Sequence, residues 1–309
     1  MDTSPHRSDF VRVNGIRLHY LDWGGSGTVL LFLAGMGSNA HLFDQFAPRF
    51  TDKFHTLALT RRGHGESEYP ETGYDIDTLT EDIRLFLDYL HVGPAILVQH
   101  SNEGIELSHF AALYPERVLK LVFLDPAYDR NSPEFKALDE KWPTMDIEYP
   151  AENGVYDNFS DFVYHRNKNY PTNATSWCDA REEDLRHQTK LNQEGKVVYK
   201  VTASIRKAIT ETMFAYTPEY DQIRAPVLSI FPIRGNTYYV TAFMTEEQQA
   251  QMMEFYDAVQ FPWMRHCIEQ FRLAVPQAKI VELPDSHTYC FITQEELVCD
   301  EMRRFLLDD

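Results

Sequence analysis

The chain has 309 residues, of which 43% are hydrophobic and 25% are charged. This length and composition exclude a disordered chain and suit one α/β domain with an insertion, or two small domains. The formal net charge of −18 disfavours nucleic acid or an anionic membrane as a partner, because both attract basic surfaces.

The N-terminal ten residues lack the apolar core of a signal peptide, and no later apolar run is as long as a membrane span. The sequence therefore predicts a cytoplasmic protein. The four cysteines are scattered, without a Cys-x-x-Cys motif or partnering histidines at metal spacing. We therefore expect free thiols.

The beginning of the chain predicts a hairpin followed by a buried strand. Alternating apolar residues at 10–13 and 16–21 flank Asn14 and Gly15, which is a strong hairpin signal. Further strands have continuous apolar runs, as is typical of a parallel sheet with both faces covered. They are expected at residues 28–33, 55–60, 95–100, 118–124, 225–231 and 280–283.

Amphipathic helices are expected between these strands. Residues 77–90 place apolar side chains on one face, and Asp77 is in a position to cap this helix. At the other end of the chain, Thr293 and Glu296 have the spacing of a capping box that opens a final helix, whose inward face includes Leu297.

The strand runs stop between residue 128 and about residue 221, where aromatic residues lie among many charges. This change predicts a helical cap at 128–221, inserted between core segments at 1–127 and 222–309. The cap aromatics either pack on one another or line an apolar ligand pocket. The helical stretch at 245–275 is longer than a connection needs and could add to the cap.

Three motifs of the core resemble those of the α/β-hydrolase superfamily. Residues 95–104 resemble its nucleophile elbow, Gly-x-Ser-x-Gly, with Gln99 and Glu103 where small residues are usual. Residues 34–38 stand in the place of its glycine-rich oxyanion loop, and residues 61–67 resemble its Asp-x-Arg-Gly-His-Gly-x-Ser segment. The resemblance implies the α/β-hydrolase fold, a mostly parallel sheet with helices on both faces and an inserted helical cap.

The resemblance also implies serine chemistry. A serine hydroxyl needs a base within hydrogen-bond reach, a group that orients the base, and donors for the developing oxyanion. Ser101 is the expected nucleophile, with the backbone amides of Met36 and Asn102 as oxyanion donors. His287 follows the last strand, where the superfamily places its base, and an imidazole can both take and return a proton near neutral pH. No metal or cofactor is needed for this chemistry.

Asp125 is the expected triad acid. The superfamily's usual place, just after the strand that ends at Phe231, holds no carboxylate. Some members, including haloalkane dehalogenases, instead carry the acid after the strand that follows the nucleophile helix, and Asp125 occupies that place. Against this role, Asp-Pro commonly ends a strand for turn reasons alone. Asp285 is too close to His287 in sequence to orient its imidazole. Asp257 lies in a predicted helix whose direction is unknown.

Hydrolysis of a small-molecule carboxylic ester is the activity that this set of residues implies. Lactone, amide or carbon–carbon bond hydrolysis would use the same triad, whereas an aspartyl-ester mechanism is disfavoured because the nucleophile is a serine. A non-catalytic ligand-binding protein on the hydrolase scaffold, or a hydrolase without useful activity, would also explain the altered elbow. The oligomeric state stays open.

Overall fold

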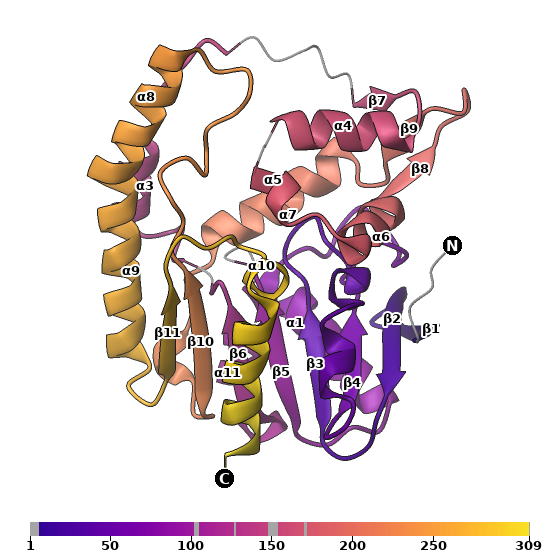
Figure 1. Ribbon diagram of the computed structural model, residues 1–309. Coiled ribbons are helices and arrows are strands. Elements are labelled where there is room, and N and C mark those ends of the chain that lie inside the picture. The colour runs from indigo at the N-terminus through magenta and orange to yellow at the C-terminus, as the bar shows by residue number, and fades with distance from the viewer. Residues whose placement is uncertain (1–5, 102–104, 127, 148–153, 170–171, 309) are drawn as a thin grey trace.

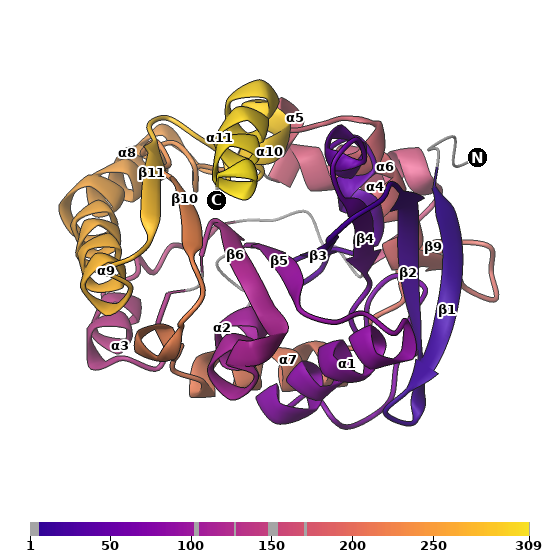
Figure 2. The same cartoon turned by 90° about the horizontal axis from the view of Figure 1, so that it is seen from below.

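An eight-stranded sheet with helices on both faces forms the centre of the computed structural model, which describes residues 6–101, 105–126, 128–147, 154–169 and 172–308 (Figures 1 and 2). The strand order is β1-β2-β4-β3-β5-β6-β10-β11. These strands are β1 (Arg7–Val13), β2 (Ile16–Gly24), β3 (Val29–Leu33), β4 (His55–Leu59), β5 (Ala95–His100), β6 (Val118–Leu124), β10 (Val227–Pro232) and β11 (Lys279–Leu283).

The pairing of the strands confirms the predicted sheet. β1 and β2 form an antiparallel hairpin around Asn14 and Gly15, whose φ angles of 49° and 77° are those of a tight hairpin turn. β2 also pairs antiparallel with β4, and every pair from β4 to β11 is parallel. The carboxyl ends of the parallel strands therefore meet at one edge of the sheet.

Side chains of successive strand residues point to opposite faces of the sheet and pack in two separate hydrophobic cores. In β6, Phe123 packs with the helices of one face, whereas Val122 and Leu124 pack with those of the other. Full burial of each such side chain stabilises the fold by about 1.5–3 kcal/mol. The first face carries α1 (Ile76–Tyr89), α2 (Glu106–Leu113) and α9 (Phe261–Ala274), and the second carries the 3-10 helix η1 (Ala40–Phe43), α10 (Cys290–Thr293) and α11 (Glu295–Leu307).

Two predicted helix starts are wrong in their capping residue. The side chain of Asp75, not of Asp77, accepts a backbone N–H of the first turn of α1, because Asp77 already lies within the helix. The capping box at Thr293 and Glu296 does not form, since Thr293 is still the last residue of α10. Leu297 is 45% exposed, so the predicted inward face of α11 is correct only in part.

The inserted segment covers the carboxyl edge of the sheet (Figure 1). A three-stranded antiparallel sheet accompanies its helices, which the prediction of an all-helical cap missed because strands of two or three residues leave no alternating pattern. The elements are α3 (Pro133–Asp139), β7 (Val155–Tyr156), α4 (Phe159–Asn169), α5 (Thr172–Thr175), α6 (Asp179–Gln188), β8 (Thr189–Leu191), β9 (Val197–Tyr199) and α7 (Ala203–Ala215).

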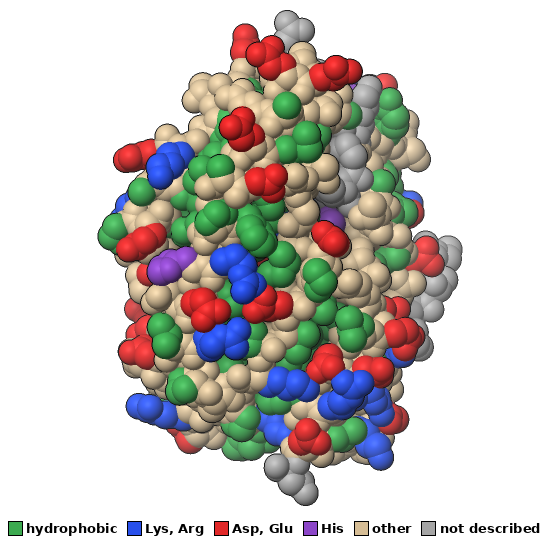
Figure 3. Space-filling view, turned by 60° about the vertical axis from the view of Figure 1, so that its left-hand side comes forward, with side chains coloured by type: hydrophobic (Ala, Val, Ile, Leu, Met, Phe, Trp, Pro, Cys, Tyr) green, Lys and Arg blue, Asp and Glu red, His purple; other side chains and the backbone are tan. Residues whose placement is uncertain are grey.

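The late helix α8 (Glu246–Phe255) adds to this cover, as the length of the 245–275 stretch suggested. Met252 and Phe255 of α8 pack against Leu138 of α3. On the side of the molecule where α8 and α9 lie, basic and acidic side chains are intermixed around hydrophobic ones (Figure 3). No helix within the described part of the chain combines the length and the hydrophobicity that a membrane crossing requires.

Candidate active site

Ser101 ends β5 in a strained backbone conformation. Its φ is 87°, in the left-handed region that non-glycine residues rarely adopt, and its amide donates a hydrogen bond of 2.8 Å to the Leu124 carbonyl of β6. A Cβ added to Gly35 would lie 2.2 Å from the Ser101 Cβ, so the loop after β3 packs directly against the serine. Ser101 thus has a strained backbone at the place where the elbow motif predicts the nucleophile, while residues 102–104 lie outside the described residues.

The structure describes only one of the two predicted oxyanion donors. Met36 lines the same cavity as Ser101 and follows Gly35, whose backbone touches the serine. Asn102 lies outside the described residues. The oxyanion hole therefore stays a prediction.

Gln99 has a structural role that explains its place in the altered elbow. Its side-chain amide donates to Glu106 at 2.7 Å, and its carbonyl oxygen accepts from the Leu107 amide at 3.0 Å. Glu106 in turn forms a buried ion pair with Arg61. Gln99 therefore joins β5 to the start of α2 by hydrogen bonds, where a small residue would allow close packing instead. Glu103 lies outside the described residues.

Asp125 ends β6 and is completely buried. Its φ is 65°, and its amide donates to the Ile230 carbonyl of β10 at 2.9 Å. The carboxylate forms an ion pair with Arg234 and accepts a hydrogen bond of 2.6 Å from the Thr288 hydroxyl. The structure thus places this acid beside the His287 loop, with Thr288 as its contact there.

His287 is buried between two aromatic rings, Tyr238 at 5.2 Å and Tyr289 at 5.3 Å between centroids. Its Nδ1 accepts a hydrogen bond of 3.1 Å from the Tyr289 amide, and its Nε2 has no hydrogen-bond partner within the described ranges. Burial, followed by the nearby Arg234 and Arg181, lowers the pKa of His287 to about 3. The imidazole is therefore neutral, and it is hydrogen-bonded to neither Ser101 nor Asp125 in this arrangement.

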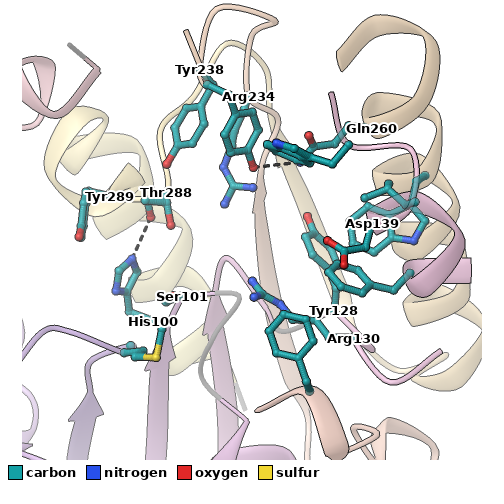
Figure 4. Close-up of a pocket in the computed structure, with 18 of the residues that line it drawn as sticks. His100, Ser101, Tyr128, Arg130, Asp139, Arg234, Tyr238, Gln260, Thr288 and Tyr289 are labelled. Atoms are coloured by element: carbon teal, nitrogen blue, oxygen red, sulfur yellow. Dashed lines mark hydrogen bonds between the residues drawn. The ribbon is translucent and has the colours of Figure 1, made fainter. Parts of the chain in front are cut away.

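A cavity of about 510 Å³ opens above Ser101 and His100 (Figure 4). His100 donates from Nε2 to the Thr288 carbonyl at 3.0 Å. Arg130, Asp139, Arg234 and Gln260 supply the charged and amide side chains of the lining. Its aromatic wall consists of Tyr128, Phe135, Trp142, Phe214, Tyr238, Tyr239, Trp263 and Tyr289. This balance of a mainly apolar wall and a few polar groups is typical of small-molecule sites.

The aromatic residues of the inserted segment therefore have both of the roles that the sequence left open. Trp142 and Phe214 line the cavity. Tyr156 and Phe162 instead pack with Leu185 in a cluster within the segment itself.

Helix α6 is fastened to the loop after β3 by buried polar contacts. The Asp184 carboxylate accepts from the Asn39 amide at 2.8 Å, from the Ser38 hydroxyl at 3.3 Å and from Arg181 at 2.9 Å. Complete burial raises the pKa of Asp184, against the opposing effect of Arg181. The inserted segment and the loop that carries Met36 are thus one hydrogen-bonded unit.

Sequence reasoning missed the partners of Asp125. The segment after β10 lacks a carboxylate but carries the cation Arg234, which complements an acid at the end of the neighbouring strand β6. Thr288 directly follows the expected base, and a hydroxyl at that position was an available signal. Arg181 and Asp184, three residues apart on α6, had the spacing of a helical ion pair.

Comparisons with known proteins agree with the observed fold. A family model described as "alpha/beta hydrolase fold" matches residues 28–162. The 2-(acetamidomethylene)succinate hydrolase of Mesorhizobium japonicum is 41% identical over 101 residues, which is 33% of this chain and 36% of that protein. Epoxide hydrolase 1 of Caenorhabditis elegans is 33% identical over 118 residues, 37% of this chain and 29% of that protein.

The matched segments thus span only about a third of the length of these curated relatives. A crystal structure of E-2-(acetamidomethylene)succinate hydrolase covers nearly the whole fold, with a TM-score of 0.73 over 97% of this chain and 99% of that chain at 22% identity. The predicted architecture, a mostly parallel sheet with helices on both faces, is confirmed. The chain therefore has the α/β-hydrolase fold, and its residues 28–162 match the family model of that fold.

Proposed function

We propose that the protein is a serine hydrolase that cleaves a carboxylic ester through an acyl-enzyme on Ser101. The observation that carries this proposal is the strained serine, with a φ of 87°, at the carboxyl end of β5, where a glycine loop touches it and a cavity of about 510 Å³ opens above it. A strained turn of this kind pushes a nucleophile out of the sheet toward its substrate.

In the proposed reaction, the Ser101 Oγ attacks the ester carbonyl carbon while His287 takes the hydroxyl proton on Nε2. The amides of Met36 and Asn102 donate to the oxyanion, and the alcohol leaves with the proton from His287. Water then attacks the acyl carbon, again with His287 as base. This cycle requires His287 to turn from the Tyr289 amide, so that Nδ1–H donates to Asp125 and Nε2 faces Ser101.

The cavity also favours a class of substrate. Arg130 lines it, together with the paired Arg234, in a protein whose net charge is −18. A cation on an aromatic wall favours a substrate with a negatively charged group close to its scissile bond. The Mesorhizobium relative is named for a derivative of succinate, a dicarboxylate, which supports a negatively charged substrate.

Other scissile bonds and a non-catalytic role also fit these residues. A lactone, an amide or a carbon–carbon bond would be cleaved by the same residues, and the acetamido group in the relative's name favours the amide among them. A ligand-binding protein without turnover is favoured by one observation, that His287 hydrogen-bonds to neither Ser101 nor Asp125.

The test is hydrolysis of nitrophenyl esters of short acids, a succinate half-ester, lactones and amides by wild type and Ser101→Ala. Ser204→Ala, at an exposed position of α7, is the matched control. We expect turnover by wild type and by the control, and a loss of about 10³-fold or more in Ser101→Ala. Equal turnover by Ser101→Ala would overturn the assignment. Substrates that raise the unfolding temperature without being consumed would establish the binding protein instead.

The charge of the substrate has its own test. Arg130→Gln should raise KM for the succinate half-ester about tenfold while leaving KM for an uncharged ester of the same alcohol unchanged. Equal effects on both esters would contradict recognition of charge by Arg130.

A further inference from the structure

A second cluster of reactive side chains lies outside the active-site cavity. His6 precedes β1, His41 lies in η1 and Asp44 directly follows η1, so the three converge where the first strand meets the turn after β3. Their side chains are only 3%, 2% and 3% exposed. None of them lines the cavity above Ser101.

The Asp44 carboxylate lies between the two imidazoles. His6 Nε2 is 3.4 Å from Oδ1, and His41 Nδ1 is 2.9 Å from Oδ2. One donor atom from each of the three residues lies within 4.8 Å of the other two. Ligands at about 2.0–2.2 Å around a tetrahedral zinc ion stand roughly 3.3–3.6 Å apart, so small shifts of these side chains would enclose an ion.

The surroundings hold the His41 ring in a fixed plane. It stacks on His187 of α6 at 4.0 Å with 15° between the planes, and on His19 of β2 at 5.7 Å. His187 is itself bound to Glu66 at 2.8 Å. A ring that is fixed by packing and by hydrogen-bonded neighbours is typical of metal ligands, whose orientation is set by the groups around them.

We propose that His6, His41 and Asp44 bind one divalent transition-metal ion, with zinc as the best match. Two imidazole nitrogens and one carboxylate oxygen are a zinc-type donor set, whereas calcium and magnesium prefer oxygen ligands. The ion stabilises the negative charge that Asp44 would otherwise bring into the protein interior. Since it joins His6 to two residues that are 35 and 38 positions later in the chain, it fastens the segment before the first strand to the 3-10 helix that follows the loop after β3.

His41 and Asp44 are only three residues apart, but His6 comes from a distant segment, which explains why the spacing of cysteines and histidines gave no sign of this site. The site is independent of the proposed hydrolysis, in which no metal takes part. Its occupancy should therefore change stability while Ser101-dependent turnover needs no added ion. Binding to the folded state alone raises stability in proportion to the logarithm of the free metal concentration.

The experiment uses the full chain without a histidine tag, stripped with a chelator and titrated with zinc by calorimetry and with cobalt by absorption. We expect one ion per chain, a tetrahedral cobalt spectrum, and an unfolding temperature that rises with zinc. Removing a residue that only hydrogen-bonds to a metal ligand weakens metal affinity about 10- to 100-fold. His6→Ala removes a proposed ligand itself and should therefore weaken zinc affinity by at least that factor.

His6→Ala is the principal variant because His6 lies before the first strand, whereas Asp44→Asn changes a buried carboxylate and serves as the second test. His55→Ala is the matched control, since His55 pairs with Asp22 at 2.9 Å in an equivalent contact outside the cluster. Wild-type binding that is no tighter than that of His6→Ala would overturn the proposal, and the cluster would then be a hydrogen-bonded group of two histidines and an aspartate.

Discussion

The nucleophile half and the acid–base half of the candidate active site are built in different ways. On the nucleophile side, Gln99 hydrogen-bonds to Glu106 and Leu107, which are only seven and eight residues away in the chain. Asp125 and His287 instead depend on segments far away: Arg234 is 109 residues and Thr288 is 163 residues from Asp125. The contacts of the first half are therefore local, whereas those of the second half join distant segments.

This difference suggests where control of the reaction lies. The strained backbone of Ser101 is held by the hydrogen bond from its amide to the Leu124 carbonyl of β6. In the proposed reaction, His287 must exchange its hydrogen bond with the Tyr289 amide for one to Asp125, whose carboxylate already binds Arg234 and Thr288. Variants of the acid–base half should therefore change both turnover and stability, and variants of the elbow supports should change mainly stability.

The largest effect is expected from the proposed base. His287→Gln should lower kcat about 10³- to 10⁴-fold, because no group would then take the Ser101 proton. Steady-state kinetics on the ester panel would measure it. His266→Gln, at an exposed position of α9, is the control and should keep full activity. Comparable activity in the two variants would move the base elsewhere.

Asp125→Asn should lower kcat about 10³-fold without loss of the fold, if the carboxylate orients the imidazole and stabilises its charge. The conservative change keeps the volume and a hydrogen-bond acceptor for Thr288. Circular dichroism would check the fold alongside the kinetics. Turnover close to that of wild type would assign Asp125 to structure alone, as the partner of Arg234.

Arg234→Met breaks a buried ion pair and should lower the free energy of unfolding by about 3–5 kcal/mol, because it leaves a carboxylate uncompensated. Urea unfolding would measure this loss. The double variant Asp125→Leu, Arg234→Met should recover much of it, since both charges are then removed. Equal losses in the single and double variants would mean that the pair itself is not what stabilises this edge.

On the nucleophile side, Gln99→Met should cost about 1–3 kcal/mol, the usual penalty for leaving buried hydrogen-bonding groups unsatisfied, here Glu106 and the Leu107 amide. Turnover per folded molecule should change less than in the acid–base variants. A larger effect on kcat than on stability would show that Gln99 acts on the serine and not only on the helix.

The smallest effect concerns acid stability. Burial is the first cause that lowers the pKa values of His64, His100 and His287 from 6.5 to about 3. The unfolded chain binds more protons than the folded one between these values, so stability is complete above pH 6.5 and falls as the pH drops. Each such histidine contributes about 1.4 kcal/mol per pH unit.

His64→Asn should remove one histidine's share of this slope in urea unfolding between pH 7 and pH 5. His55→Asn, at a half-exposed position, is the control. The same slope in both variants would contradict the assignment of His64 as a buried neutral group.

The sequence was sufficient for those parts of the molecule that local patterns define. Apolar runs located the strands of the sheet, and a serine between a run and an amphipathic segment located the elbow. The contacts of Arg234 and Thr288 with Asp125 were not predictable in the same way, because they depend on which strand ends meet at the edge of the sheet. Nearby residues of the same type also limit sequence patterns: Asp75 caps α1, whereas the pattern indicated Asp77, two residues later.

The bond between Asp184 and the turn after β3 limits how this protein can diversify. A chimaera that exchanged residues 128–221 for the insertion of another hydrolase would leave the Asn39 amide and the Ser38 hydroxyl without their buried acceptor. The strain would fall on the loop that touches Ser101. Point changes in the cavity-facing side chains of the insertion would instead leave the Asp184 contacts intact.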